Sequence, residues 1–384
     1  MNQSESITFC KRCLMDSTEM NFSLDKYDFC NYCNDYLKSK NREDSLRQYS
    51  SKEFENLLSR IKKSGKNKKY DCIVGVSGGV DSSWVLKIVK DFGLRPLAVH
   101  MDNGWNSELA QNNISNLVTS LGIDLYTHVI NWDEYRNLMQ SFFDSDVVDV
   151  ELLYDNAMLA TNYKLAKKFG VKYILGGTNT ATEGMSMPEN WNWFKYDKKN
   201  IKSIAQIFGK QKLITFPSIG IIGYLIYEYL FRINWVSILD YIEYDKNEAI
   251  DALSSKYNYK PYPYKHYESV FTRFYQGYIL PNKFGIDKRK LHLSSLIVNG
   301  ITSRDEGLKD LKKIPYPSEK DLKEDIEYFL KKMNWKNSDL VAYLNRPRKE
   351  HDFYPSSKSL WEFLKKINKF LIRNIRVSFA KPNR

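Results

Sequence analysis

This sequence has no apolar stretch long enough to cross a membrane. Its most apolar run, residues 216–231 (FPSIGIIGYLIYEYLF), is shorter than the roughly 20 residues that a spanning helix requires, and it contains Pro217 and Glu228. The N-terminus also lacks the basic and then apolar segments of a secretory signal. We therefore expect a cytoplasmic protein without a transmembrane segment, in which residues 216–231 form a buried or partner-facing helix. Shallow contact of this helix with a membrane surface is the alternative.

Cysteine is scarce, with five residues in a chain of 384, and four of them are grouped near the N-terminus. Cys10, Cys13, Cys30 and Cys33 form the pattern C-x2-C-x16-C-x2-C, which is typical of zinc sites. Four thiolates leave no open coordination position, so the sequence predicts a structural Zn²⁺ that supplies the folding energy of a small module. Two disulfides or a redox pair are the alternatives. The missing signal segment disfavours the disulfides, and the second matched pair disfavours a redox centre.

Acidic residues are the minority, and the excess of positive charge is concentrated at one end. The net charge is +12, and residues 346–384 contain 11 Lys and Arg against 3 Asp and Glu. Such a tail faces nucleic acid, anionic lipid or an acidic partner, or it is a solvated helix face. Disorder of the chain as a whole is disfavoured by an aromatic content of 14%.

A glycine-rich turn follows the first strand-like run. Residues 70–76 (YDCIVGV) are apolar and β-branched, and apolar residues recur at helical spacing from Trp84 to Phe92. Between them lies SGGVDSS, whose glycines let the backbone approach a ligand and whose hydroxyl and N–H groups form an anion cradle. An aspartate in such a cradle implies Mg²⁺. The predicted nucleotide-binding residues are Ser77, Gly78, Gly79, Asp81, Ser82 and Ser83.

This loop is not a Walker P-loop, because it is shorter and no lysine follows its glycines. The seven residues SGGVDSS instead resemble the signature of the PP-loop ATP pyrophosphatases. The resemblance implies a HUP-like domain that holds the pyrophosphate of ATP and transfers AMP to an oxygen of the substrate, with Asp81 as a catalytic residue. A chance Ser/Gly turn that caps a helix is the alternative.

The chain then alternates strand-like and helix-like segments. Strands are expected at residues 95–101, 125–130 and 172–175, and helices at residues 106–121 and 151–169. This alternation predicts a doubly wound parallel sheet, in which ligands bind beyond the carboxyl ends of the strands. The segments that follow two of these strands supply further candidates for binding ATP or Mg²⁺: His100, Asp102, Gly177, Thr178 and Glu183.

The length of the chain predicts more than one globular part. We expect a zinc module and the start of a connector over residues 1–45. The PP-loop domain should occupy residues 46–250. A mainly helical region for substrate or partner, including the basic tail, should occupy residues 251–384.

Outside the zinc module the only cysteine is Cys72, which lies inside the first predicted strand. PP-loop enzymes that transfer sulfur depend on reactive cysteines or an iron–sulfur cluster in the catalytic domain, so a nitrogen nucleophile fits this chain better. We expect no glutaminase activity in this chain either, because residue 2 is Asn and no cysteine is left for a Cys–His triad. We therefore expect a separate glutaminase subunit to supply ammonia, docking on residues 216–231 or on the tail.

The second half contains a further ordered set of motifs. KHYESVFTRFYQGY begins at Lys265, and FGIDKRK and HLSS follow at residues 284–290 and 292–295. Together with the first C-x-R-C turn, SGGVDSS and GGTNTATEG, this set resembles the N-acetyl sugar amidotransferases of bacterial surface-polysaccharide (LPS O-antigen) biosynthesis, the WbpG type, over roughly residues 8–315. The resemblance implies an enzyme that forms acetamidino sugars from the N-acetyl groups of nucleotide-linked sugars.

This reaction needs side chains that hold phosphates and move protons. His266 and Glu268 are candidates to move protons for incoming ammonia, and Arg273 is a further catalytic candidate. The candidates to hold the diphosphate of the sugar nucleotide are Lys265, Arg273, Lys288, Arg289 and Lys290. A solvated basic turn at residues 288–290 and a structural role for His266 are the alternatives.

Two other functions stay open. A tRNA-modifying PP-loop enzyme of the amine-adding type is favoured by the basic tail and the zinc module. A scaffold without enzymatic activity would bind ATP and release no pyrophosphate. In the interpretation that we favour, the partners are a glutaminase and a sugar nucleotide, and no nucleic acid is expected.

Overall fold

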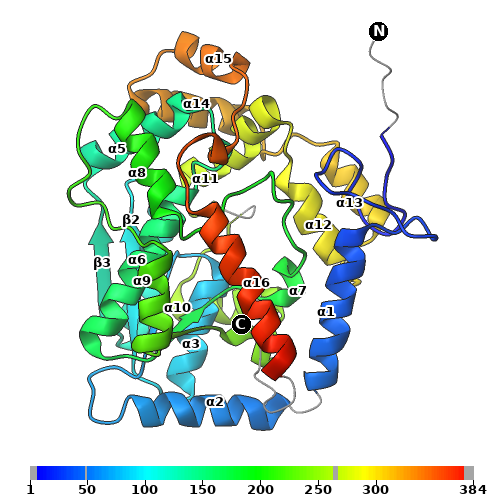
Figure 1. Cartoon of the computed structure of the whole chain (residues 1–384). Helices are drawn as coiled ribbons and strands as arrows, with labels where there is room; N and C mark the ends of the chain where they lie inside the picture. Colours follow the sequence, from blue (N-terminus) through cyan, green and yellow to red (C-terminus); the bar gives the residue numbers. More distant parts are fainter. Residues whose placement is uncertain (1–6, 48–49, 263–266, 376–384) are drawn as a thin grey trace.

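A computed structural model describes residues 7–47, 50–262 and 267–375 of the chain (Figure 1). At its centre is a five-stranded sheet in the order β3-β2-β1-β4-β5, in which every neighbouring pair is parallel. The strands are β1 (Cys72–Gly75), β2 (Pro96–Asp102), β3 (Leu125–Val129), β4 (Tyr173–Gly176) and β5 (Asn234–Ser237). The predicted doubly wound parallel sheet is confirmed, and β5 is a strand that the sequence pattern did not reveal.

Helices cover both faces of the sheet because β1 is apolar on both sides. Cys72 and Val74 pack into a core with α2 (Ser50–Ser64), α3 (Val80–Asp91), α4 (Glu108–Leu121) and α10 (Lys246–Tyr257). Ile73 points the other way, into a core with α6 (Leu152–Phe169) and α9 (Ile221–Leu225). The boundary expected at residue 250 falls inside α10, which packs against α3. The division into domains stays a prediction.

The C-terminal region is mainly helical, as predicted, and it surrounds a third core that also contains the N-terminal cysteines. Trp105, just beyond β2, is fully buried in this core and contacts the rings of Phe271 and Phe329. The remaining helices are α1 (Asn31–Arg47), α5 (Trp132–Asp144), α7 (Thr180–Glu183), α8 (Lys198–Phe208), the π-helix η1 (Ile226–Leu230), the 3-10 helix η2 (Ile238–Tyr241), α11 (Val270–Phe274), the π-helix η3 (Tyr275–Phe284), α12 (Lys288–Val298), α13 (Arg304–Leu311), α14 (Glu319–Met333), α15 (Asn337–Asn345), the 3-10 helix η4 (His351–Phe353) and α16 (Lys358–Ile375).

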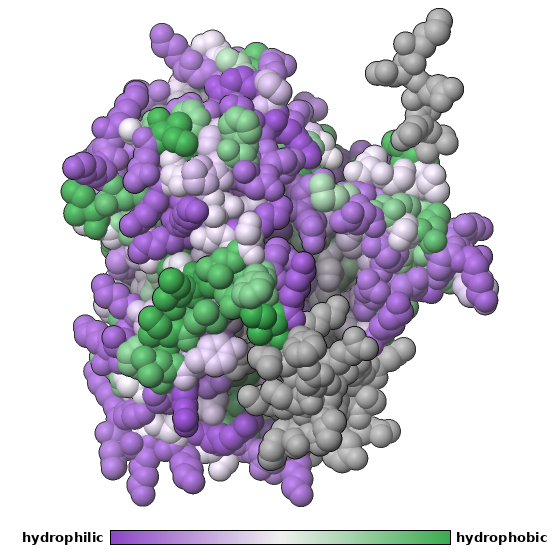
Figure 2. All heavy atoms as spheres, viewed as in Figure 1, coloured by the Kyte–Doolittle hydropathy of each residue, from purple (hydrophilic) through white to green (hydrophobic). Residues whose placement is uncertain are grey.

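Residues 216–231, expected as a buried or partner-facing helix, form a shorter and more exposed element. The helix begins only at Ile221 and passes into η1 after Leu225. Ile222 and Leu230 expose 68% and 72% of their surface, so this face of the helix is not buried, and the partner-facing alternative stays a prediction. Figure 2 shows hydrophobic side chains gathered in the area of α9 and α16. Within the three described ranges, no helix combines the length and the apolar character needed to span a bilayer.

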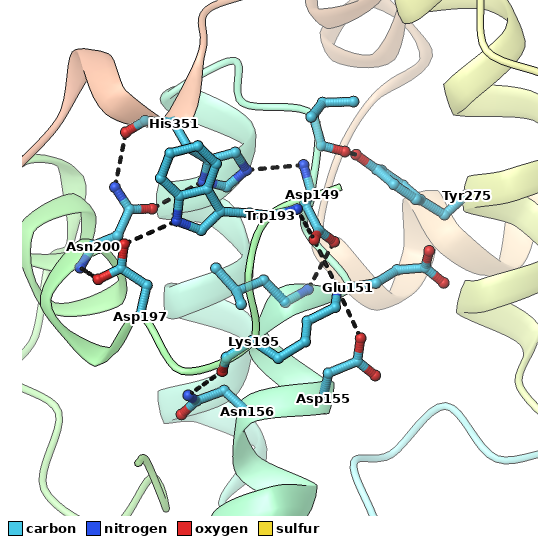
Figure 3. A network of polar contacts seen from close by, with 12 residues as sticks. Asp149, Glu151, Asp155, Asn156, Trp193, Lys195, Asp197, Asn200, Tyr275 and His351 are labelled. Carbon is cyan, nitrogen blue, oxygen red and sulfur yellow. Dashed lines mark hydrogen bonds and ion pairs between the residues drawn. The ribbon is translucent and has the colours of Figure 1, made fainter. Parts of the chain in front are cut away.

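An ion-pair group links α6 and the segment before it to the segment before α8 (Figure 3). Lys195 Nζ lies 2.7 Å from an Asp149 oxygen and 2.9 Å from an Asp155 oxygen. The same Asp149 oxygen accepts the backbone N–H of Trp193 at 2.8 Å, so this carboxylate is fully compensated although it is buried. The group joins the segment before α6 to the segment before α8.

His351 extends this group to the C-terminal segment (Figure 3). Its ring stacks on Trp193, with centroids 5.0 Å apart. Nε2 accepts the backbone N–H of Asp149 at 3.1 Å, so Nδ1 carries the proton that is donated to Oδ1 of Asn200 at 2.9 Å. Burial lowers the pKa of His351 to about 4, and the ring is therefore neutral at neutral pH.

Protonation of His351 should weaken the fold in a defined pH range. The unfolded chain takes up a proton on this residue near a pKa of 6.5, whereas the folded chain does so only near a pKa of about 4. As the pH is lowered from 6.5 to about 4, the free energy of unfolding should therefore decrease by up to about 3 kcal/mol through this group. Denaturant titrations of the wild type and of His351→Gln at several pH values measure the slope of the unfolding free energy against pH. The variant should lose most of it, and an unchanged slope would contradict the neutral assignment.

Candidate nucleotide and metal sites

The phosphate loop lies between the end of β1 and the start of α3, as predicted. The Ser77 and Ser82 hydroxyl oxygens are 3.2 Å apart, and the Gly79 N–H donates to Ser77 Oγ at 3.2 Å. Gly78 has a φ of 85°, and a Cβ there would lie 2.7 Å from the carbonyl oxygen of Ala110 in α4. Glycine alone satisfies both conditions. No side chain caps the start of α3, which leaves the helix N-terminus facing the loop as an anion site.

The segment after β4 packs directly on this loop. A Cβ at Gly177 would lie 2.9 Å from the backbone nitrogen of Ser82, so the two backbones are in contact. Thr178 Oγ1 lies 2.7 Å from Ser237 Oγ at the end of β5. Gly177 thus lies beside the phosphate loop, with Thr178 next to it in the chain, whereas Glu183 is an exposed residue of α7.

Hydrogen bonds join the end of β2 to the turn that follows it. His100 is buried, and its Nδ1–H donates to the Val76 carbonyl oxygen at 3.0 Å. Its Nε2 then accepts from the Asn106 amide at 3.1 Å, and burial lowers the pKa of His100 so that the ring stays neutral. Asp102 accepts the N–H of Gly104 at 2.8 Å. His100 therefore holds the segment after β1, at Val76, next to the segment after β2, at Asn106. The ATP-binding roles of His100 and Asp102 stay predictions.

Two tyrosines from the segments around α10 cover the phosphate loop. Tyr244 donates a hydrogen bond to Asp81, and Tyr262 donates one to the Gly78 carbonyl oxygen at 3.0 Å. Burial and the charge of Asp81 raise the pKa of Tyr244, so this phenol keeps its proton. Neither residue was predicted from the sequence, although six tyrosines between residues 241 and 264 were a visible signal.

Glu268 is the predicted C-terminal residue that the structure brings to the phosphate loop. Its carboxylate occupies the space that a side chain at Gly79 would fill. Backbone bonds fix this position, because the Ser107 N–H donates to the Glu268 carbonyl at 2.9 Å and the Val270 N–H donates to the Trp105 carbonyl at 2.9 Å. A carboxylate beside an anion site is suited to hold a cation or to accept a proton.

The predicted basic residues of the C-terminal region are engaged in ion pairs within the protein. The pairs and their N–O distances are Arg273–Asp325 (2.5 Å), Lys288–Glu151 (2.8 Å), Arg289–Asp287 (2.7 Å) and Lys290–Asp16 (2.8 Å). Binding of a diphosphate by these cations would require the pairs to open, so their roles stay predictions. Lys265 and His266 lie outside the described residues.

The four N-terminal cysteines converge, as their spacing predicts. All four are buried and their sulfur atoms lie within 4.8 Å of one another, with Cys10–Cys33 at 3.8 Å and Cys13–Cys30 at 3.5 Å. Thiolates on a tetrahedral zinc ion stand about 3.8 Å apart, so the cluster fits this metal. Burial in β1 raises the pKa of the Cys72 thiol, which makes this fifth cysteine unreactive.

Comparison with known proteins gives two family matches. Residues 49–186 match the NAD synthase family, and residues 268–368 match the family described as LPS biosynthesis protein WbpG-like, C-terminal domain. An uncharacterized protein of Methanocaldococcus jannaschii is 33% identical over 127 residues, which are 33% of this chain and 44% of that protein. The match thus spans less than half the length of this curated relative.

Three solved structures are similar to this chain at low TM-scores. The NH3-dependent NAD synthetase of Campylobacter jejuni has 18% identity and a TM-score of 0.28, covering 53% of this chain and 83% of that one. The NMN synthetase of Francisella tularensis has 15% identity and a TM-score of 0.27, covering 58% and 98%. A predicted subunit of tRNA methyltransferase from Methanocaldococcus jannaschii has 14% identity and a TM-score of 0.27, covering 48% and 75%.

We expect one zinc ion per chain on the four-cysteine cluster. Cys30→Ser removes one thiolate and should lower both the zinc content and the thermal stability, because metal binding supplies the folding energy of the module. Cys72→Ser is the matched control, since Cys72 is buried but outside the cluster, and it should retain zinc. Elemental analysis of the purified proteins measures the metal. Iron in place of zinc would overturn the assignment and reopen sulfur transfer.

Proposed function

We propose that this chain converts the N-acetyl group of a nucleotide-linked sugar into an acetamidino group. The premise is that it is a WbpG-type PP-loop protein of an ATP-using amidotransferase or ligase family. In this proposal it is an ATP-dependent C–N ligase that releases AMP and pyrophosphate. One observation carries the proposal. Glu268, the first residue of the WbpG-like match, lies against the phosphate loop of the NAD synthase-like match.

The chemistry requires activation of an amide oxygen, because an amide carbonyl is a poor electrophile. The oxygen attacks the α-phosphorus of ATP, and the bond to the β-phosphate oxygen breaks with its electron pair on the departing pyrophosphate. Ammonia then adds to the imidate carbon. The bond from this carbon to the AMP oxygen breaks, AMP leaves, and one proton is released, which yields the amidine.

In this proposal, residues at the sheet edge assist both steps. The hydroxyls of Ser77 and Ser82 and the start of α3 would hold the pyrophosphate part of ATP. Asp81 is the candidate ligand for Mg²⁺, which when bound would neutralise phosphate charge. Glu268 is the candidate acceptor for the proton released as ammonia adds.

The supply of ammonia points to a partner protein. The four clustered cysteines fit zinc, and Cys72 is fully buried in β1, so none of the five offers the activated thiolate that glutamine hydrolysis usually uses. We therefore propose a separate glutaminase subunit that passes ammonia to this chain. Passage between two proteins would protect ammonia from protonation in water, which removes its nucleophilic lone pair.

A tRNA-modifying activity of the amine-adding type is the second candidate. The basic tail favours it, because Lys and Arg along residues 346–384 would suit phosphates of RNA. Filter binding of tRNA with a steep dependence on salt would support this candidate, whereas weak binding that is similar for any polyanion would not.

The loop chemistry makes a direct prediction about products. ATP should yield AMP and pyrophosphate in the presence of substrate, because no lysine follows the loop glycines to hold a γ-phosphate as in a Walker loop. Asp81→Asn should lower the rate on the order of a hundredfold or more. Asp91→Asn, at the other end of α3, is the matched control and should keep the activity. Chromatography of the nucleotides measures the products, and ADP as the main product would sink the assignment.

The lack of an activated thiolate among the five cysteines predicts which nitrogen source the enzyme can use. The purified chain should form the acetamidino product from a UDP-linked N-acetyl sugar with ammonium chloride at mildly alkaline pH, where more free ammonia is present. With glutamine it should do so only after the glutaminase is added. Pyrophosphate release across a set of such sugars measures both reactions. Turnover with glutamine by the chain alone, free of contaminating glutaminase, would contradict the prediction that this chain cannot hydrolyse glutamine.

A further inference from the structure

Two helices leave apolar stripes in solvent. On α9 and η1, Ile222, Ile226 and Leu230 expose 68%, 42% and 72% of their surface. They are four residues apart, so they lie on one side of the helix. On α16, Leu360, Phe363 and Ile367 expose 44%, 58% and 38% at the same kind of spacing. Single exposed apolar residues are ordinary, but two ordered stripes are not.

The two stripes belong to one surface. Trp361 of α16 packs on Tyr224 of α9, with ring centroids 6.2 Å apart, and also stacks on Phe194 at 5.7 Å. These rings hold α16 against α9 and turn the other apolar residues of both helices outward. Figure 2 shows the resulting hydrophobic area. We call the six residues Ile222, Ile226, Leu230, Leu360, Phe363 and Ile367 the α9–α16 face.

The segments that carry this face are strongly basic. Residues 195–232 contain seven Lys and Arg against Asp197 and Glu228. Lys195 is held by Asp149 and Asp155, Asp197 is buried, and the other six cations flank α9 and η1 in the sequence rather than lying within them. Residues 358–384 contain eight Lys and Arg against one Glu. An amphipathic helix with cations beside its apolar side is the pattern of proteins that lie in a membrane interface.

We propose that the α9–α16 face docks this protein on an anionic lipid surface, without crossing it. The apolar stripes would enter the boundary of headgroups and acyl chains, and the lysines would contact acidic headgroups. A second copy of the chain is a poorer fit, because a twofold interface would place the basic segments against themselves. The inference does not depend on the sugar substrate proposed above.

Flotation of the full chain with lipid vesicles tests this inference. We expect binding to vesicles of phosphatidylcholine and phosphatidylglycerol, little binding to phosphatidylcholine alone, and loss of binding as salt is raised. The double variant Ile222→Ser/Leu230→Ser should bind on the order of tenfold or more weakly, because two apolar side chains no longer enter the interface. Both residues are highly exposed, so the fold should survive, as circular dichroism and ammonium-driven turnover would show.

A matched control separates the face from general stickiness. Val129→Ser/Ile301→Ser removes apolar residues that are exposed by 68% and 59% elsewhere on the molecule, and it should bind vesicles as the wild type does. Equal loss in both double variants, or no binding of the wild type to anionic vesicles, overturns the proposal. A dimer that only Ile222→Ser/Leu230→Ser dissociates would assign the face to a second copy instead. Loss of glutamine-driven turnover in that variant, with no vesicle binding by the wild type, would assign it to the glutaminase.

Discussion

Two glycine contacts set the spacing of the segments that meet at the carboxyl edge of the sheet. Gly78 lies against the backbone of Ala110, and Gly177 lies against the backbone of Ser82. A side chain at either position would push the phosphate loop away from α4 or from the end of β4. A third glycine, Gly79, leaves the space beside the loop that the Glu268 carboxylate occupies. The candidate site therefore depends on close packing of main chain before it depends on any charged group.

Local sequence patterns were sufficient for the features that one segment determines. The apolar run before SGGVDSS predicted β1, the phosphate loop and α3 in order, and the alternation that followed predicted the parallel sheet. The cysteine spacing likewise predicted a cluster that the structure brings together. In each case the signal is a period or a spacing within a few residues, which is the information that a single sequence carries most reliably.

Contacts between distant residues were beyond the same reasoning. The covering of Asp81 by Tyr244 joins residues 163 positions apart, and the bond between Asn200 and His351 spans 151 positions. The expected burial of residues 216–231 does not hold for one side of the helix, for a related reason. Composition shows that a helix is apolar, but it does not show which of its sides lacks a neighbour. Lys288 and Lys290 showed charge in the sequence, and only the fold showed the distant carboxylates of Glu151 and Asp16 that they face.

The zinc module also reaches the nucleotide end of the molecule. Tyr36 of α1 donates a hydrogen bond to the Thr180 carbonyl oxygen of α7 at 3.1 Å, three residues beyond Gly177. Arg304 of α13 holds the module from the other side through the carbonyl oxygens of Cys13 and Cys10, at 3.1 and 3.2 Å. One hydrogen bond thus joins the cysteine module to the segment after β4. If a nucleotide bound at this segment favoured that bond, thermodynamic reciprocity would require a metal-filled module to favour the nucleotide by the same factor.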